Sequence, residues 1–402
     1  MMPLADVKNS RQDNNFKRVI LIVLDGVGAG ASPDSGDYGD QDAATLQHVA
    51  QVAGGLNLPH LEQLGLGHVT SIAGVTKVSS PAGCWGKMAE KSAGKDSVTG
   101  HWELTGVVLD RPFAVFPDGF PEAIINAFID ETGLKPLGNI ASSGTDILIS
   151  LGEEHLQTGR PIVYTSTDSV FQIAAHEDVV SPERLYTICR QAEKILHPYN
   201  VCRVIARPFR GTDATNFYRT SGRHDFPCKP KSQTVLELLK RKGLNTYAIG
   251  KIGDLFAGEG ITHSLSTRNN HEGMSRTLTA LDEINRGLIM TNLVDFDMLY
   301  GHRLDSVGFA TALQEFDSWL PELLGKMKSD DLLIITADHG CDPTTSGTDH
   351  SREYVPLLLY SAAISVPQNL GIRQSFADVG ATVADNFHIA LQTGQSFLSN
   401  LR

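Results

Sequence analysis

One segment decides the fold class of this chain: Asp331-Leu332-Leu333-Ile334-Ile335-Thr336-Ala337-Asp338-His339-Gly340. A short apolar run bounded by polar and turn residues predicts a strand that is buried on both faces. Ligands of open α/β sheets bind outside the carboxyl ends of the strands, so this strand delivers a carboxylate and an imidazole to that edge. His350 follows after a polar loop and completes a candidate set of metal ligands. Taken alone, the segment fits a helix-capping aspartate and a surface histidine equally well.

Length and charge restrict the class of protein. The chain has 402 residues, 41% of them hydrophobic, and a formal net charge of −12. That length predicts two domains or one large domain with a sizeable core. The negative charge argues against a surface for nucleic acid or anionic membranes, and it requires metal ions or a local cationic cluster wherever an anionic substrate binds. No apolar run approaches the ~20 residues that span a bilayer.

The cysteines and the first residues indicate the compartment. The five cysteines are scattered through the chain without a CxxC pair, which is typical of reduced thiols. Residues 1–15 are polar and lack the apolar segment of a signal peptide. We therefore expect a cytoplasmic protein, and we expect a monomer that binds neither nucleic acid nor membranes.

Two further apolar segments end on aspartates, at 19–25 and at 288–297. In a mostly parallel sheet the carboxyl ends of such strands share one edge. The residues expected to converge there are three carboxylates and three histidines on the adjoining loops: Asp25, Asp297, Asp338, His302, His339 and His350. Crowded carboxylates raise one another's pKa unless cations lie between them. The pattern therefore predicts a dinuclear metal site of the kind that catalyses phosphoryl transfer.

A dinucleotide site is the weaker interpretation of the first of these strands. The glycines after it, Gly26, Gly28 and Gly30, alternate without the GxGxxG spacing of a pyrophosphate-binding turn.

A second motif lies between glycines, at Gly94-Lys95-Asp96-Ser97-Val98-Thr99-Gly100-His101-Trp102-Glu103. Glycines let backbone N–H groups approach an anion, and a hydroxyl beside a metal can act as a nucleophile. The simpler interpretation is a turn followed by a helix that Ser97 or Thr99 caps. On this segment alone, the simpler interpretation is favoured.

The pattern changes between about Pro112 and Pro227. Strand-like segments at 161–165 and 201–206 flank a predicted helix at 182–196, whereas 113–117 and 138–144 are expected to be connections. This alternation predicts a small α/β or α+β insert. The insert carries arginines of the kind that bind phosphate through two oxygens at once: Arg203, Arg207, Arg210, Arg219 and Arg223. An ordinary surface patch explains the same composition equally well.

In combination, these residues resemble the phosphopentomutases of the alkaline phosphatase superfamily. The resemblance covers nearly the whole chain and rests mainly on the motif at 94–103 and on Asp297-Met298-Leu299-Tyr300-Gly301-His302-Arg303. It implies an α/β fold with an alkaline-phosphatase-like core, in which a mostly parallel central sheet is flanked by helices. That core would comprise residues 1–111 and 229–402, and a smaller inserted α/β cap domain would comprise residues 112–228.

The resemblance also implies the site. Two Mn²⁺ ions would bind, one to Asp297, His302 and His350, and the other to Asp25, Asp338 and His339. Ser97, where the family usually has threonine, would carry the phosphoryl group, with Thr99 as the alternative. Lys251 would neutralise the transferring phosphoryl group. The implied contacts of the cap with the sugar phosphate are Ser166, Asp168, Val170, Arg207 and Arg219.

The implied reaction interconverts ribose 1-phosphate, or 2-deoxyribose 1-phosphate, and the corresponding 5-phosphate through a phosphoenzyme and a sugar bisphosphate. A sugar 1,6-bisphosphate or ribose 1,5-bisphosphate would prime it, and the cap would exclude water. The alternatives are a metal-dependent phosphatase or phosphodiesterase, another phosphomutase such as the cofactor-independent phosphoglycerate mutase, and a non-catalytic protein whose metals brace the fold. The Trp102-Glu103 continuation, the arginine-bearing insert and the Ser97 hydroxyl favour the mutase.

Overall fold

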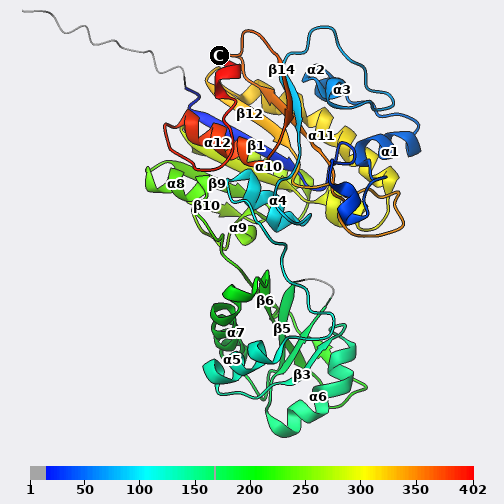
Figure 1. Cartoon of the computed structure of the whole chain (residues 1–402), viewed down its shortest axis with the longest axis vertical. Helices are drawn as coiled ribbons and strands as arrows, with labels where there is room; N and C mark the ends of the chain where they lie inside the picture. Colours follow the sequence, from blue (N-terminus) through cyan, green and yellow to red (C-terminus); the bar gives the residue numbers. More distant parts are fainter. Residues whose placement is uncertain (1–14, 167–168) are drawn as a thin grey trace, which may run out of the picture.

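The chain forms two bodies, each built around its own β-sheet, in a computed structural model that describes residues 15–166 and 169–402 (Figure 1). The first sheet has eight strands in the order β10-β9-β11-β1-β12-β13-β2-β14. In chain order these strands are β1 (Arg18–Leu24), β2 (Cys84–Met88), β9 (Asn245–Ile249), β10 (His263–Leu265), β11 (Gly287–Leu293), β12 (Asp331–Thr336), β13 (Val355–Tyr360) and β14 (Asn369–Arg373). Only β13 runs antiparallel to its neighbours, so the expected mostly parallel sheet is confirmed.

Helices cover both faces of the first sheet (Figure 1). They are α1 (Thr45–Val52), α2 (Pro59–Gln63), α3 (Leu66–Val69), α4 (Ser97–Leu104), α8 (Val235–Arg241), α9 (Ile252–Leu255), α10 (Asn270–Glu283), α11 (Ser306–Lys326) and α12 (Ala377–Asn386). The central strands β1, β11 and β12 are buried along their whole length, because helices pack on each side of them. Such strands need apolar residues at every position, which explains their continuous rather than alternating pattern.

The second body contains a six-stranded sheet, in which five strands follow the order β3-β4-β5-β6-β7 and β8 pairs with β6. Its strands are β3 (Leu137–Ala141), β4 (Ile162–Thr165), β5 (Val170–His176), β6 (Arg203–Arg210), β7 (Tyr218–Arg219) and β8 (His224–Pro227), and its helices are α5 (Glu122–Thr132), α6 (Asp146–Thr158) and α7 (Pro182–Leu196). The core between this sheet and helices α5 and α7 is separate from the core of the first body. The insert therefore has its own α/β architecture.

Two local predictions need correction. The strand expected at 288–297 ends at Leu293, and Asp297 lies in a π-helical turn at Phe296–Gly301. The strand ends there because Asp295 and Asn270 exchange two hydrogen bonds, of 2.9 and 2.7 Å, that replace sheet pairing. The connection expected at 138–144 contains most of β3, whose register shifts after Gly138. Turn-forming residues are present there because an edge strand tolerates such an irregularity.

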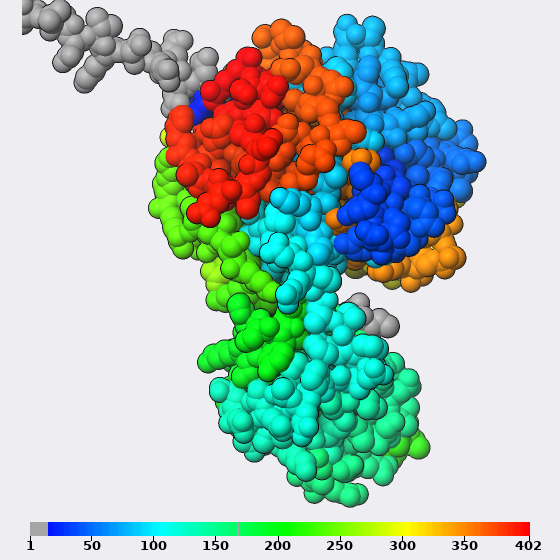
Figure 2. All heavy atoms as spheres, in the orientation of Figure 1, coloured from blue at the N-terminus to red at the C-terminus, as the bar shows by residue number. Residues whose placement is uncertain are grey.

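The chain crosses between the two bodies twice, before α5 and after β8, and Figure 2 shows a narrow waist at these crossings. Asn200 contacts both segments. Its carbonyl accepts from the Ala114 N–H at 2.9 Å, its side-chain amide donates to the Pro112 carbonyl, and its amide oxygen accepts from the Lys231 ammonium. Hydrogen bonds to one residue therefore link the two crossings. Within the described residues, no helix is long and apolar enough to cross a membrane.

A buried ion pair fixes the end of the first sheet that lies opposite Asp25. Arg18 and Asp331 are register partners on β1 and β12, with side chains 1% and 0% exposed. The Arg18 Nε donates to Asp331 at 2.8 Å, Nη2 donates to the other oxygen of Asp331, and Nη1 donates to the carbonyls of Leu281 and Ile284. We predict that Arg18→Met lowers the free energy of unfolding by about 3–5 kcal/mol, because it leaves the Asp331 charge buried and unpaired.

Denaturant titration of both variants measures this effect against Lys17→Met as the control. Lys17 pairs with Asp330 at 2.7 Å, but its side chain is 67% exposed. Removing that surface pair should change stability by about 0–1 kcal/mol. Equal effects of the two substitutions would contradict the role given to Arg18.

Candidate active site at the carboxyl edge of the first sheet

The sheet register brings the predicted carboxylates to one edge. Leu24 is the partner of Leu293, and Val23 is the partner of Thr336, so β1, β11 and β12 end at the same level. Asp25 follows β1 directly, and its N–H donates to the Leu293 carbonyl at 3.2 Å. Asp338 lies two residues beyond β12, and the π-helical turn after β11 carries Asp297 to the same place.

All six predicted metal ligands lie at this edge. The ligand atoms of Asp25, Asp338 and His339 lie within 4.8 Å of one another, as do those of Asp297, His339 and His350. The His339 Nε2 lies 3.3 Å from both Asp25 and Asp338, and the imidazoles of His302 and His350 each lie 3.3 Å from Asp297. His339 therefore belongs to both groups, and the division of the six ligands between two ions stays a prediction.

Several polar atoms of these groups are buried without a hydrogen bond. Among the described residues, no hydrogen-bond partner reaches four atoms here: Asp25 Oδ1, Asp297 Oδ1, Asp338 Oδ2 and His350 Nε2. Buried polar atoms almost always have a partner, and buried charges are otherwise paired or bound to metals. Oxygen and imidazole nitrogen donors together suit divalent ions such as Mn²⁺ or Zn²⁺. The residues present therefore fit a metal centre.

Charges of opposite sign counteract the effect of burial on these carboxylates. Burial raises the pKa of Asp297, but His350, His339 and Lys251 outweigh it and hold the pKa below its usual range. Burial likewise opposes ionisation of Asp338, yet His339 and His101 lower its pKa. These contacts keep the carboxyl groups ionised, as metal ligands must be.

Lys251 lies at the same edge, immediately after β9 and at the start of α9. Its ammonium is 3.1 Å from Asp25 Oδ2 and 3.6 Å from Asp297 Oδ2. Burial lowers the pKa of Lys251, but the two carboxylates outweigh it and raise the pKa overall. The predicted cation therefore contacts one carboxylate of each ligand group.

Ser97 is the first residue of α4, and its Oγ lies 3.1 Å from His339 Nε2. The helix is capped by Asp96, which accepts from the Val98 and Thr99 N–H groups, so the expected caps Ser97 and Thr99 were wrong. Thr99 is buried, and its hydroxyl donates to the other Asp96 oxygen at 2.5 Å. Of the two candidate hydroxyls, the structure places Ser97 beside the metal-binding groups.

The rest of the motif fixes α4 in position. At Gly100, a Cβ atom would lie 2.0 Å from the Asp338 carbonyl oxygen, so only glycine lets the helix pack against that strand end. The Trp102 indole donates to the Leu255 carbonyl at 2.8 Å. Glu103 accepts from the N–H groups of Lys91, Ser92 and Phe376 and from the Ser375 hydroxyl. These contacts hold the serine at the sheet edge.

Three residues at this edge were not singled out by the sequence. His101 Nδ1 lies 3.0 Å from Asp338 Oδ2, the Asn292 amide donates to Asp25 Oδ2 at 2.9 Å, and the Cys341 sulfur lies with Asp297 and His302. An asparagine inside a continuous apolar strand is the signal that indicates the role of Asn292, because a buried amide requires a partner. His101 was present in the quoted motif without an assigned role.

The expected sugar-phosphate contacts lie in the second body. Val170 begins β5, Arg207 lies on β6 and Arg219 lies on β7. Ser166 directly follows β4. Asp168 lies outside the described residues. These residues are on a different sheet from the carboxylates.

An arginine cluster surrounds the hydroxyl of Tyr164 on β4. Burial raises the pKa of Tyr164, while the charges of Arg207, Arg219 and Arg223 act against this. The hydroxyl has no hydrogen-bond partner among the described residues, and a Cβ at Gly144 would lie 3.2 Å from it and 3.0 Å from an Arg219 nitrogen. Arg223 is paired with Asp225 at 2.8 Å, which leaves an excess of positive charge. Arginines and a free hydroxyl form a suitable site for a phosphate.

Comparison with known proteins identifies the family. The model of the metalloenzyme superfamily matches residues 17–391. A phosphopentomutase of Syntrophotalea carbinolica is 58% identical over 386 residues, 96% of this chain and 98% of the relative. A phosphopentomutase of Desulfitobacterium hafniense is 54% identical over 388 residues, 96% of this chain and all of the relative. A solved structure of Leishmania mexicana phosphoglycerate mutase is 14% identical to this chain, with a TM-score of 0.48. The match covers 96% of this chain and 98% of the mutase chain. The chain belongs to the metalloenzyme superfamily and, within it, to the phosphopentomutase family.

Proposed function

We propose that this chain is an isomerase that interconverts ribose 1-phosphate, or 2-deoxyribose 1-phosphate, and the corresponding 5-phosphate. Its family membership supports this activity. One observation carries the proposal: the Ser97 hydroxyl lies 3.1 Å from His339, beside two overlapping groups of buried carboxylates and histidines. A nucleophile held next to metal ligands is the arrangement that phosphoryl transfer requires.

Two Mn²⁺ ions are assigned to this edge, one to Asp297, His302 and His350 and the other to Asp25, Asp338 and His339. When bound, such ions stabilise the negative charge of a transferring phosphoryl group. The first sheet, with residues 1–111 and 229–402, is the proposed core domain that holds them.

Ser97 is the residue that carries the phosphoryl group. As the first residue of α4, it lies where the N–H groups and dipole of a helix favour negative charge. Lys251 adds a positive charge beside Asp25 and Asp297, and it is the residue that neutralises the transferring group. Ser97 itself is half-buried, so the exclusion of water during transfer is the role of the cap.

The reaction proceeds by two transfers. Phosphorylated Ser97 donates its phosphoryl group to the free hydroxyl of a bound pentose monophosphate, which gives a pentose bisphosphate and free Ser97. The bisphosphate then turns over, and its other phosphoryl group returns to Ser97. A sugar 1,6-bisphosphate or ribose 1,5-bisphosphate primes the cycle, because it transfers one of its phosphoryl groups to free Ser97.

The second body, at residues 112–228, is the proposed cap that binds the phosphate that is not being transferred. Its arginine cluster and the Tyr164 hydroxyl support this role, with Arg207 and Arg219 as phosphate contacts and Ser166, Asp168 and Val170 at the sugar. Because the phosphate site and Ser97 lie on different sheets, the cap must close over the core during transfer. The narrow waist in Figure 2 is the hinge for such a motion.

The first prediction concerns the nucleophile. Ser97→Ala should keep fold and metal content but lower mutase activity by at least ~10⁴-fold, because no hydroxyl accepts the phosphoryl group. The assay supplies Mn²⁺, a trace of sugar 1,6-bisphosphate and ribose 5-phosphate, and it follows ribose 1-phosphate. Intact mass measures whether the enzyme carries a phosphoryl group.

Thr99→Val is the matched control, because it removes the neighbouring hydroxyl without touching the metal-binding groups. It should lower stability and keep the phosphoenzyme. Full activity of Ser97→Ala would exclude the mechanism, and release of inorganic phosphate by the wild-type enzyme in place of ribose 1-phosphate would make the chain a phosphatase.

The second prediction concerns the metals. Asp25→Asn should lower the Mn²⁺ bound per chain from about two ions to about one, because Asp25 belongs to only one ligand group. Elemental analysis after gel filtration measures this stoichiometry. Asp317→Asn is the control, since Asp317 is equally buried but accepts only from His60 and Leu61 at the start of α2. Equal metal loss in both variants would contradict the assignment.

The third prediction concerns the phosphate site in the cap. Arg219→Met should lower kcat/KM for ribose 5-phosphate by about 10- to 100-fold, the effect of losing one charge-assisted hydrogen bond to phosphate. Arg210→Met is the control, because Arg210 lies at the end of β6 and pairs with Glu177 at 2.6 Å. If the two variants behave alike, the cluster around Tyr164 is not the phosphate site.

A further inference from the structure

Two cysteines face each other where the chain leaves the second body. Strands β6 and β8 are antiparallel, with Arg203 opposite Pro227, so Cys202 and Cys228 form the next pair outward. The Cys228 N–H donates to the Cys202 carbonyl at 2.9 Å, which confirms that the pairing continues. Directly opposed residues of such a pair have Cα atoms about 4.5–5.5 Å apart, within the range of about 4.4–6.8 Å that a disulfide spans. A bond between them therefore needs no backbone movement.

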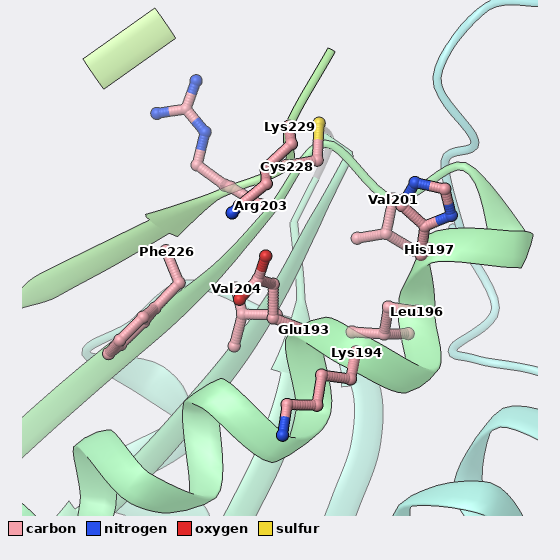
Figure 3. A pocket seen from close by; sticks show the side chains of 10 residues that line it. All are labelled: Glu193, Lys194, Leu196, His197, Val201, Arg203, Val204, Phe226, Cys228 and Lys229. Carbon is pink, nitrogen blue, oxygen red and sulfur yellow. The ribbon is translucent and has the colours of Figure 1, made fainter. Parts of the chain in front are cut away.

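The two cysteines are opposite each other across the strand pair, and one of them is partly exposed. A hydrogen bond with the Cys202 thiol, followed by burial, raises the pKa of the Cys228 thiol. Cys202 is buried, with 8% of its surface exposed, whereas Cys228 is half-buried. Cys228, Arg203 and Lys229 line a pocket of about 300 Å³. Figure 3 shows the side chains at its wall. A small molecule can reach Cys228 through this pocket.

The position of the pair links it to the hinge. Cys228 is followed by Lys229, which pairs with Glu259 of the first body at 2.6 Å, and by Lys231, which donates to Asn200. A covalent bond between Cys228 and Cys202 would fix the point at which this crossing leaves β8. The bond would anchor the start of this crossing to the residue that precedes β6, so the crossing would bend only beyond Cys228.

We propose that Cys202 and Cys228 form a modification site at which a small-molecule disulfide introduces a reversible intramolecular disulfide that restrains the hinge. The raised pKa of Cys228 keeps its thiolate fraction small and makes the first step slow: the thiol loses its proton, and the thiolate attacks one sulfur of the small disulfide and expels the first small thiolate. The Cys202 thiolate then attacks the Cys228 sulfur and expels the second. In sum, two cysteine thiols are oxidised to one disulfide, one small disulfide is reduced to two thiols, and the two protons pass to the released thiols.

The test uses the full-length, pre-reduced protein incubated with oxidised glutathione and then alkylated. Peptide mapping should find a peptide that joins Cys202 to Cys228, formed over roughly minutes to hours and reversed by dithiothreitol. Cys202→Ser should stop at a glutathione adduct on Cys228, and Cys228→Ser should show no adduct on Cys202. Cys189→Ser, at a buried cysteine of α7, should behave as the wild type. Absence of the joined peptide, or an adduct on Cys202 in Cys228→Ser, overturns the proposal.

The effect on the hinge needs a second measurement, which rests on the proposed function. Oxidised wild-type enzyme should turn over pentose phosphate about two-fold or more slowly than the reduced enzyme, because the cap closes less freely. Dithiothreitol should restore the rate, and Cys228→Ser should be unaffected by the same treatment. Unchanged turnover with the disulfide formed would overturn the restraint. The mapping result does not depend on turnover, so a failure of the proposed reaction would be recognised separately.

Discussion

Repulsion between buried carboxylates is the constraint on which the rest of the structure depends. Asp25, Asp297 and Asp338 are buried within one edge of a sheet, where like charges would normally neutralise by binding protons. The protein holds them there by two means. The parallel ladder fixes the ends of β1, β11 and β12 at one level, and those strands cannot shift because they are buried on both faces. Histidines and Lys251 then supply the positive charge that lowers the pKa of Asp297, and histidines lower that of Asp338.

The same requirement explains the helix that carries Ser97, the proposed nucleophile. A serine is useful beside these carboxylates only if its position is fixed within a fraction of an ångström. Helix α4 achieves this through contacts of different kinds along its length: a carboxylate cap at Asp96, close backbone packing at Gly100, and hydrogen bonds from Trp102 and to Glu103. Most of the motif therefore positions Ser97 and does not itself take part in the chemistry.

Charge is divided between the two bodies. A chain with a net charge of −12 repels phosphates on average, so the groups that attract them must be concentrated. In the first body, carboxylates and histidines are concentrated in a site that suits cations, and cations attract phosphate. In the second body, arginines are concentrated around Tyr164. The separation of these groups on two sheets places their different chemistry in different bodies. It also makes the waist, with Asn200 and the two facing cysteines, the part of the structure that relates one site to the other.

The sequence by itself determined the class of fold and the list of metal-binding candidates, because both depend on local pattern. Continuous apolar runs that end on aspartate predict buried parallel strands with carboxylates at one edge, and the helix expected at 182–196 forms as Pro182–Leu196. The sequence could not place Asp297 in a π-helical turn or assign the cap of α4 to Asp96, since each depends on a hydrogen bond whose partner a pattern does not specify.

Tertiary structure alone decided that Ser97 and not Thr99 lies beside His339, that Asn292 and His101 support the carboxylates, and that Cys202 faces Cys228. These are contacts between residues far apart in the chain, and only the packing of α4 on the sheet and the register of the strands bring them together.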